Sequence, residues 1–296
     1  MELLNRFVSD INVGESADFE NLRLTPLTLK QAAHRNERYI SLDMALDEGV
    51  AEVREVSDSG SVGQVRVMNL SDRFLVLFDG DGLKGAKQNR IMEQTVVIAP
   101  KSDLVVPVNC VERGRWNYNS DRFGGADFKA TPSVKKNKAA LKKQGLDRNV
   151  QRSVWQSVDR SAMCLSVNSY SDDLGEIMER SGISTDLIEK YLSESTCHGY
   201  LVQGAGEPFI EIFPDAGSAK TWAIKSAKGW IADTRFKPTK KYPVDVLLEA
   251  LRISSWAPAK TVGSETAYQS SDAHDGRITY EDGNLLHLYT SFNLSH

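Results

Sequence analysis

The sequence lacks several features that each mark a class of protein. Its 296 residues contain only three cysteines, Cys110, Cys164 and Cys197, which are odd in number and far apart. This is no disulfide framework, so we expect a reducing, cytoplasmic location. No stretch reaches the roughly 18 apolar residues of a membrane helix, and the first segment, MELLNRFVSDINVGES, lacks the basic and apolar parts of a signal peptide. We therefore expect a soluble protein with no membrane partner.

Signatures of common enzyme classes are also missing. The chain contains no P-loop, no G-x-S-x-G nucleophile motif and no C-x-x-C or H-x-x-x-H spacing for a metal. The segment GAGEPF, residues 204–209, lacks the third glycine and the helix start of a dinucleotide fingerprint. The net charge of −4 gives no general attraction to nucleic acid. These absences predict no metal site and leave the cofactor unidentified.

The chain does contain the elements of an ordinary globular protein, with 41% hydrophobic residues. Residues 1–116 hold several short segments with strand-like patterns, such as RFLVLFDGDG and QTVVIAPKSDLVVPVNC, and this spacing is typical of a β-sandwich or a partly open barrel. Residues 150–255 contain helical patterns. Residues 256–296 again show the alternation of apolar and polar residues that is typical of strands. No flexible linker marks a boundary. We therefore predict a single α+β domain with a sandwich-like N-terminal antiparallel sheet, to which the C-terminal strands return.

A polar, basic segment separates the first two parts. Residues 117–149 include a cluster of lysines, namely Lys135, Lys136, Lys138, Lys142 and Lys143. A connection of this length is usually functional or disordered. Trp116 and Tyr118 lie before these lysines in the chain. One interpretation is a nucleotide site, in which an aromatic ring stacks on the base and the cations contact phosphate. The alternative is that the lysines form a solvated helix face and that Trp116 belongs to the core. We expect contact with nucleic acid nowhere in the chain except locally through these lysines.

One carboxylate lies where a buried strand face ends. Alternation along the segment LVVPVNCVE, residues 104–112, places Glu112 on the same face as Cys110 and three apolar side chains. A carboxylate at such a place needs a cation or water, because burying it unpaired is costly. Arg90, Arg113 and Arg115 are the nearest cations in the sequence. One interpretation is a structural Glu–Arg pair that closes the rim of the sheet.

The other interpretation is a polar pocket at the mouth of the sheet. In that pocket Gln88 and Asn89 would form hydrogen bonds with a ligand, and Arg90 would hold an anion. Gly85 supports this interpretation, since glycine lets the backbone approach a ligand closely. The two interpretations use the same residues and stay open here.

These residues also resemble a known family. The segments GDGLKGAKQNR and VPVNCVERGRW are similar to the ARG-and-rhodanese-phosphatase-superfamily-associated protein domain, and VQRSVWQSV, EIFPDAGSAKTWAIKSAKGWIAD and DGNLLHL extend the resemblance over residues 10–292. The resemblance implies an association with ADP-ribosylglycohydrolases and phosphatase-like proteins, and hence NAD or ADP-ribose metabolism, without a defined reaction. The family's polar signature falls on Gly85, Gln88, Asn89, Arg90, Cys110, Glu112, Gly114, Arg115 and Trp116.

Two hypotheses follow, and they leave open whether the protein is an enzyme. In the first, the chain is an enzyme or a ligand-binding protein for an ADP-ribose-like molecule or another nucleotide. Arg90 and Arg115 would then hold phosphate and Trp116 would stack on the base, while Glu112 would be the general base. In the second, the chain is a non-enzymatic binding or assembly module with a protein partner, for example in a bacterial stress or anti-phage system.

Overall fold

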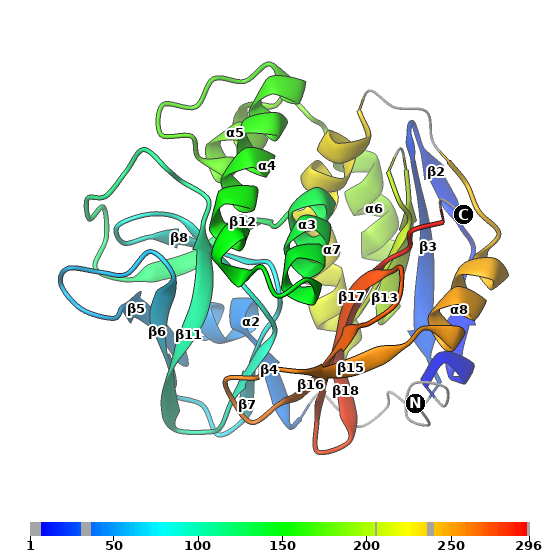
Figure 1. Cartoon of the computed structure of the whole chain (residues 1–296), viewed down its shortest axis with the longest axis horizontal. Helices are drawn as coiled ribbons and strands as arrows, with labels where there is room; N and C mark the ends of the chain where they lie inside the picture. The colour runs from blue at the N-terminus through cyan, green and yellow to red at the C-terminus, as the bar shows by residue number, and fades with distance from the viewer. Residues whose placement is uncertain (1–6, 31–36, 205, 236–239, 295–296) are drawn as a thin grey trace.

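The computed structural model describes residues 7–30, 37–204, 206–235 and 240–294. Figure 1 shows a barrel at the left, a large sheet at the right, and the helices α3 (Pro132–Lys143) and α7 (Ala216–Thr234) between them. Most strand pairs are antiparallel, although β4 (Tyr39–Ser41) and β7 (Phe74–Leu77) run parallel. Apart from a short helix at Leu42–Asp47, the described helices follow the barrel strands in the chain and precede the last strands. The predicted α+β class is therefore confirmed.

The barrel closes in the order β11-β6-β5-β12-β8-β9, because β9 pairs with both β8 and β11. Its strands are β5 (Ala51–Glu55), β6 (Gln64–Asn69), β8 (Asp81–Gly85), β9 (Arg90–Met92), β11 (Ser102–Cys110) and β12 (Phe123–Lys129). A small sheet of β4 (Tyr39–Ser41), β7 (Phe74–Leu77) and β10 (Val96–Ile98) packs with helix α2 (Leu42–Asp47) against the same core. Alternate residues such as Val65 and Val67 are fully buried there, as the period of two predicts.

The large sheet combines strands from both ends of the chain, in the order β1-β3-β13-β14-β18-β17-β16-β15 with β2 beside β3. Their bounds are β1 (Ile11–Val13), β2 (Ala17–Phe19), β3 (Leu22–Leu29), β13 (Gly199–Gln203), β14 (Phe209–Ile212), β15 (Trp256–Ala259), β16 (Thr266–Ser270), β17 (Asp275–Glu281) and β18 (Asn284–Ser291). The expected return of the C-terminal strands to a sheet with N-terminal strands is thus confirmed. The single-domain boundary, residues 1–296, stays a prediction.

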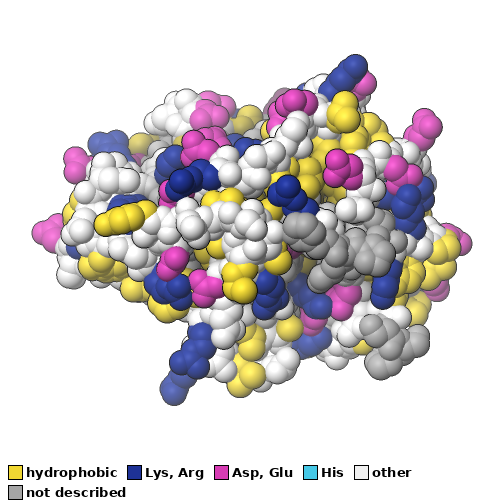
Figure 2. Space-filling model, turned by 90° about the horizontal axis from the view of Figure 1, so that it is seen from above, with side chains coloured by type: hydrophobic (Ala, Val, Ile, Leu, Met, Phe, Trp, Pro, Cys, Tyr) yellow, Lys and Arg dark blue, Asp and Glu magenta, His cyan; other side chains and the backbone are white. Residues whose placement is uncertain are grey.

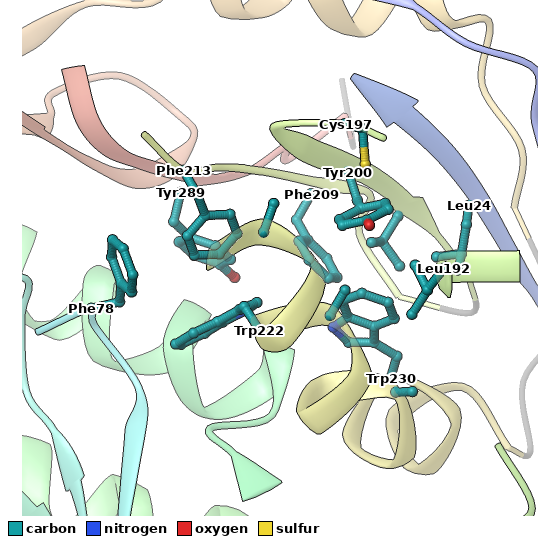
Figure 3. Packing of buried hydrophobic residues seen from close by; sticks show 14 of the residues in the cluster. Leu24, Phe78, Leu192, Cys197, Tyr200, Phe209, Phe213, Trp222, Trp230 and Tyr289 are labelled. Atoms are coloured by element: carbon teal, nitrogen blue, oxygen red, sulfur yellow. The ribbon is translucent and has the colours of Figure 1, made fainter. Parts of the chain in front are cut away.

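Helices lie on both faces of the large sheet and also against the barrel. They are α3 (Pro132–Lys143), α4 (Val150–Leu165), α5 (Leu174–Arg180), α6 (Asp186–Glu194), α7 (Ala216–Thr234) and α8 (Val244–Ile253), with a short 3₁₀ turn at Asp147–Asn149. On one face Trp222 and Trp230 of α7 pack against Phe213 and Tyr200, with ring centroids 5.4 and 6.2 Å apart (Figure 3). On the other face Leu251 of α8 joins a second core. Among the described residues, no helix is long and apolar enough to cross a membrane.

The surroundings of α3 change the interpretation of the polar segment, residues 117–149. Lys135 and Lys138 are only 2% and 1% exposed, so the expectation of a solvated helix face is wrong for them. Their ammonium groups pair with Glu211 of the large sheet and with Asp79 after β7. These partners lie 76 and 59 residues away in the chain, which is why the sequence gives no sign of them. The lysines therefore attach α3 to both the barrel side and the sheet.

The remaining lysines of this segment are paired as well. Lys136, Lys142 and Lys143 each have a carboxylate partner at 2.6 to 2.7 Å. On the face seen in Figure 2, lysine and arginine side chains are interspersed with aspartate and glutamate instead of forming one basic patch. These ion pairs neutralise the lysine charges on which a local contact with nucleic acid would depend.

Candidate functional site

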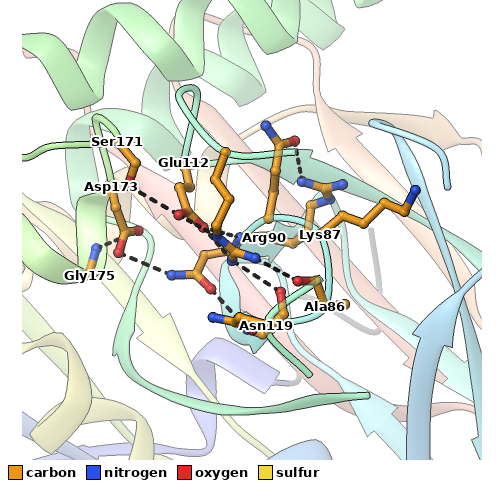
Figure 4. A network of polar contacts seen from close by, with 12 residues as sticks. Ala86, Lys87, Arg90, Glu112, Asn119, Ser171, Asp173 and Gly175 are labelled. Carbon is orange, nitrogen blue, oxygen red and sulfur yellow. Dashed lines mark hydrogen bonds and ion pairs between the residues drawn. The ribbon is translucent and has the colours of Figure 1, made fainter. Parts of the chain in front are cut away.

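The residues that the sequence singled out meet at one mouth of the barrel. Gly85 ends β8, Arg90 begins β9 and Glu112 follows β11, so neighbouring strands bring them together. Figure 4 shows the polar contacts among these residues. We call the following group the mouth network: Gly85, Gln88, Asn89, Arg90, Glu112, Arg115 and Asp173.

Glu112 is the centre of the mouth network. Arg115 forms a bidentate ion pair with it, with Nε 2.7 Å from Oε1 and Nη2 2.6 Å from Oε2. The backbone N–H of Asn89 donates to Oε2 at 2.9 Å, and the hydroxyl of Ser171 donates to Oε1 at 3.1 Å. A carboxylate has about four acceptor positions, so these donors occupy all of them. A general-base role for Glu112 stays a prediction, and it requires one donor to leave.

Asn89 links Glu112 to Asp173. Its Oδ1 accepts a hydrogen bond from the backbone N–H of Gly85 at 2.9 Å, and its Nδ2 donates to Oδ2 of Asp173 at 3.1 Å. Gly85 has a φ of +119°, and a side chain there would meet Oγ of Ser120 at 2.5 Å. The backbone conformation therefore accounts for a glycine at this position without a ligand.

Arg90 is fully buried beneath the mouth. Its Nη1 donates to Oε1 of Gln88 at 2.7 Å, and its Nη2 lies 3.8 Å from the carboxylate of Glu55. The guanidinium also lies 5.5 Å from the ring centroid of Trp116. Burial lowers the pKa of Arg90. A phosphate could reach this side chain only if the groups around it moved. The contact between Arg90 and phosphate stays a prediction.

Trp116 lies at the surface, which overturns the alternative that it is a core residue. Trp116 and Tyr118 are 40% and 48% exposed. Nζ of Lys87 lies 5.6 Å from the first ring and 4.8 Å from the second. Exposed aromatic rings beside a cation can stack on a base. The proposed stacking role of Trp116 is therefore sterically open, and it stays a prediction.

Cys110 of the family signature is buried and serves to attach a helix. Its backbone N–H donates to Oε1 of Gln151 at 2.8 Å, and its carbonyl accepts from Nε2 of the same side chain at 2.9 Å. This reciprocal pair fixes α4 against β11. Burial raises the pKa of the Cys110 thiol, which keeps it protonated.

A pocket of about 460 Å³ opens beside the mouth network. We call it the α5 pocket. It is lined by Lys84, Asn89, Asp127, Phe128, Asp173, Gly175, Glu176, Met178, Glu179 and Lys228. Within the part of the chain that the structure describes, Lys84 and Lys228 have no ion-pair partner. The pocket therefore offers two cations that no carboxylate among the described residues neutralises.

Asp173 belongs to both the mouth network and the α5 pocket. It is 8% exposed, and it accepts hydrogen bonds from Asn89 and from the backbone N–H groups of Gly175 and Glu176. Burial raises the pKa of Asp173, the nearby charge of Glu112 adds to the rise, and the Asn89 hydrogen bond opposes it. A buried acid with a raised pKa in a pocket is a candidate proton donor.

Asp173 is not among the residues that the sequence predicted. Its signal was its place directly before the helical pattern LGEIMER, where aspartate is a common N-cap. That signal indicates a helix start and says nothing about a pocket, because Asn89 lies 84 residues away in the chain.

All residues of the mouth network and the α5 pocket lie in the part of the chain that matches one family model. Residues 10–291 match the model of the ARG and Rhodanese-Phosphatase-superfamily-associated Protein domain. The chain belongs to this family. The resemblance drawn from the QNR and CVERGRW segments is thus confirmed. No curated protein and no solved structure matches the chain.

The family match also includes a second set of buried charges, beneath α3. We call Lys135, Lys138, Asp79, Glu211 and His287 the α3 cluster. Nε2 of His287 lies 3.0 Å from Oε1 of Glu211, and Nδ1 lies 2.7 Å from the Thr95 hydroxyl. Burial lowers the pKa of His287, so the ring is neutral near pH 7. Each lysine of the cluster has its own carboxylate, and the cluster has no residue in the α5 pocket.

No metal centre is evident in this part of the molecule. Among the described residues, no group of three or more histidine, cysteine, aspartate or glutamate side chains is placed to hold a metal ion. The candidate site is therefore described by its hydrogen bonds, its acid and its two lysines alone.

Proposed function

We propose that this protein binds an ADP-ribose-like molecule or another nucleotide in the α5 pocket. The observation that carries the proposal is that Lys84 and Lys228, unpaired within the described residues, share one pocket with the buried pair of Asn89 and Asp173. Lysine ammonium groups bind phosphate as point charges. The volume of about 460 Å³ lies within the roughly 300–1,000 Å³ that is typical of small-molecule pockets.

The carboxylates of the same pocket narrow the class of ligand. Asp127 and Glu179 are exposed, line the pocket and have no ion-pair partner within the described residues. A bare polyphosphate would meet these like charges. A nucleotide carries phosphates for the lysines and ribose hydroxyls that can donate hydrogen bonds to the carboxylates. The association with ADP-ribosylglycohydrolases that the family resemblance implies favours the same class.

In this proposal the mouth network positions the binding groups. Glu112 holds the backbone of Asn89, and Arg115 holds the loop by donating to the carbonyls of Ala86 and Gly85 at 2.6 and 3.3 Å. Asn89 in turn orients Asp173. If the protein is an enzyme, Asp173 is the group placed to transfer a proton to a leaving group, because its raised pKa favours the protonated form.

Isothermal titration calorimetry and thermal unfolding with ADP-ribose, NAD, cyclic ADP-ribose and AMP test the proposal. At about 100 times its dissociation constant, a ligand stabilises the folded state by roughly 2.7 kcal/mol. Lys84→Ala and Lys228→Ala should each weaken binding about tenfold. Lys101→Ala is the matched control, since Lys101 is exposed and pairs with Asp72 at 3.3 Å outside the pocket. A panel with no binding, or equal loss in Lys101→Ala and Lys84→Ala, would contradict it.

A second function is favoured by the way the protein's own donors surround Glu112. All four acceptor positions of Glu112 are occupied by donors of the protein, so this carboxylate needs no ligand to be satisfied. This favours the non-enzymatic binding or assembly module. Its signature is a flat ligand panel together with a marked loss of thermal stability in Arg90→Ala and Glu112→Ala. Unchanged melting temperatures in both variants would rule against it.

A further inference from the structure

We propose a second ligand site, for a small aromatic carboxylic acid, in a cavity between the large sheet and α3, α4 and α7. The cavity has a volume of about 290 Å³ and shares no lining residue with the α5 pocket. This volume is just below the roughly 300–1,000 Å³ that is typical of small-molecule pockets. It suits a molecule of one or two rings. We call this space the α4 cavity.

The floor of the α4 cavity is apolar and aromatic. Phe209 of β14 and Trp230 of α7 line it, with ring centroids 6.3 Å apart and planes at 60° (Figure 3). Leu22 and Val202 of the large sheet complete the floor, and all four side chains are buried. An aromatic ring placed here buries apolar surface and can form edge-to-face contacts.

The space is open because the side chains of α4 on the opposite wall are short. Ser157, Ser161 and Cys164 of α4 stand four and then three residues apart, so they lie on one face of the helix. The hydroxyls of the two serines donate to carbonyls of α4 itself, at 3.0 and 3.1 Å. These short side chains leave a ring-sized gap against the aromatic floor, and a larger residue on this face would fill it.

The charge at the rim determines the class of ligand. Lys136 is neutralised by Glu207 at 2.7 Å, and Asp233 accepts hydrogen bonds from the backbone and hydroxyl of Ser133. Arg160 also lines the cavity and, within the described residues, has no ion-pair partner. A guanidinium binds a carboxylate with two parallel hydrogen bonds. An aromatic ring that carries one carboxylate therefore matches both the floor and the rim.

Calorimetry with benzoate and indole-3-carboxylate, each compared with its neutral amide, tests this inference. We expect at least one acid to bind about tenfold more tightly than its amide, and Arg160→Gln to remove that preference. Arg152→Gln is the matched control, because Arg152 is an exposed arginine of the same helix that does not line the cavity. Equal affinity for acid and amide, or no binding of either acid at millimolar concentration, would overturn the proposal.

Two further measurements separate this site from the α5 pocket. Cys164 is exposed and lines the cavity, whereas Cys110 and Cys197 are buried, so a bound acid should slow alkylation of Cys164 by iodoacetamide. Ser161→Phe should fill the cavity and abolish binding, with Arg160→Gln as the independent test if that variant does not fold. Lys84→Ala should leave acid binding unchanged. An equal loss in Lys84→Ala, or unprotected Cys164, would overturn the assignment.

Discussion

The mouth network and the α3 cluster both bury charged side chains, but their charges are balanced differently. In the α3 cluster each buried lysine has its own carboxylate, Asp79 for Lys138 and Glu211 for Lys135. In the mouth network the carboxylate of Asp173 is held by an amide and by backbone N–H groups, with no cation partner within the described residues. Burial of charge alone therefore does not mark a site. The informative feature is a buried acid that faces a pocket without a counter-charge.

The largest effect should come from breaking the α3 cluster. Lys138→Met leaves Asp79 buried without its cation, which should lower the free energy of unfolding by about 3–5 kcal/mol in urea titrations. The double variant Lys138→Met/Asp79→Asn should recover part of this loss. Lys101→Ala, which removes an exposed pair, should cost no more than about 1 kcal/mol. If Lys138→Met and Lys101→Ala lowered the free energy of unfolding equally, the distinction between the buried α3 cluster and an exposed ion pair would be refuted.

The mouth network should tolerate disruption somewhat better. Glu112→Ala removes four accepted hydrogen bonds, but the side chain of Arg115 is 18% exposed and can be partly solvated. We expect a loss of about 2–3 kcal/mol in the same titrations. Glu48→Ala is the control, since Glu48 pairs with Arg73 at 2.6 Å on the surface. A cost as small as that of the control would mean that Glu112 does not organise the mouth.

The turn that carries Asn89 should be sensitive to Gly85. Gly85→Ala forces a side chain into a φ of +119° and against Ser120, at an expected cost of about 1–3 kcal/mol. Gly124→Ala on β12 is the matched control, because a side chain there meets nothing within 4 Å. If both substitutions had the same effect on the melting temperature, backbone strain would not explain the glycine.

The smallest expected effect is an opposite response to pH. Burial raises the pKa of Asp173, so its contribution to stability is present at low pH and is lost as the pH rises through that raised value. Burial alone would also raise the pKa of Asp79, but Lys138 and Lys135 lower it, so its contribution is lost as the pH falls.

Unfolding titrations between about pH 3 and 7 can separate these two contributions. Relative to the wild type, Asp173→Asn should become more stable as the pH rises above the ordinary aspartate value. Asp79→Asn should become less stable as the pH rises toward that value from below. Parallel curves for the two variants would contradict the difference between the two regions.

The sequence predicted the position of Glu112 more closely than the contacts that Glu112 forms. Strand alternation correctly placed Glu112 at the exit of a buried face and required a cation or water beside it. The partner is Arg115, whereas Arg113 pairs with Asp159 and Asp172 at the surface. Three arginines near in sequence could not be ranked because the choice depends on how the loop after β11 turns.

By itself, the sequence determined the α+β class, the coarse order of a β-rich, a helical and a second β-rich part, the family and the polar residues at the strand ends. These follow from local patterns of apolar, polar and turn-forming residues. Only the tertiary structure decided that Lys135 and Lys138 are buried, that Asp173 joins Asn89 in a pocket, and that the barrel closes through β9. Each of these depends on contacts between segments far apart in the chain, and the free energy of such contacts comes from packing that no local pattern encodes.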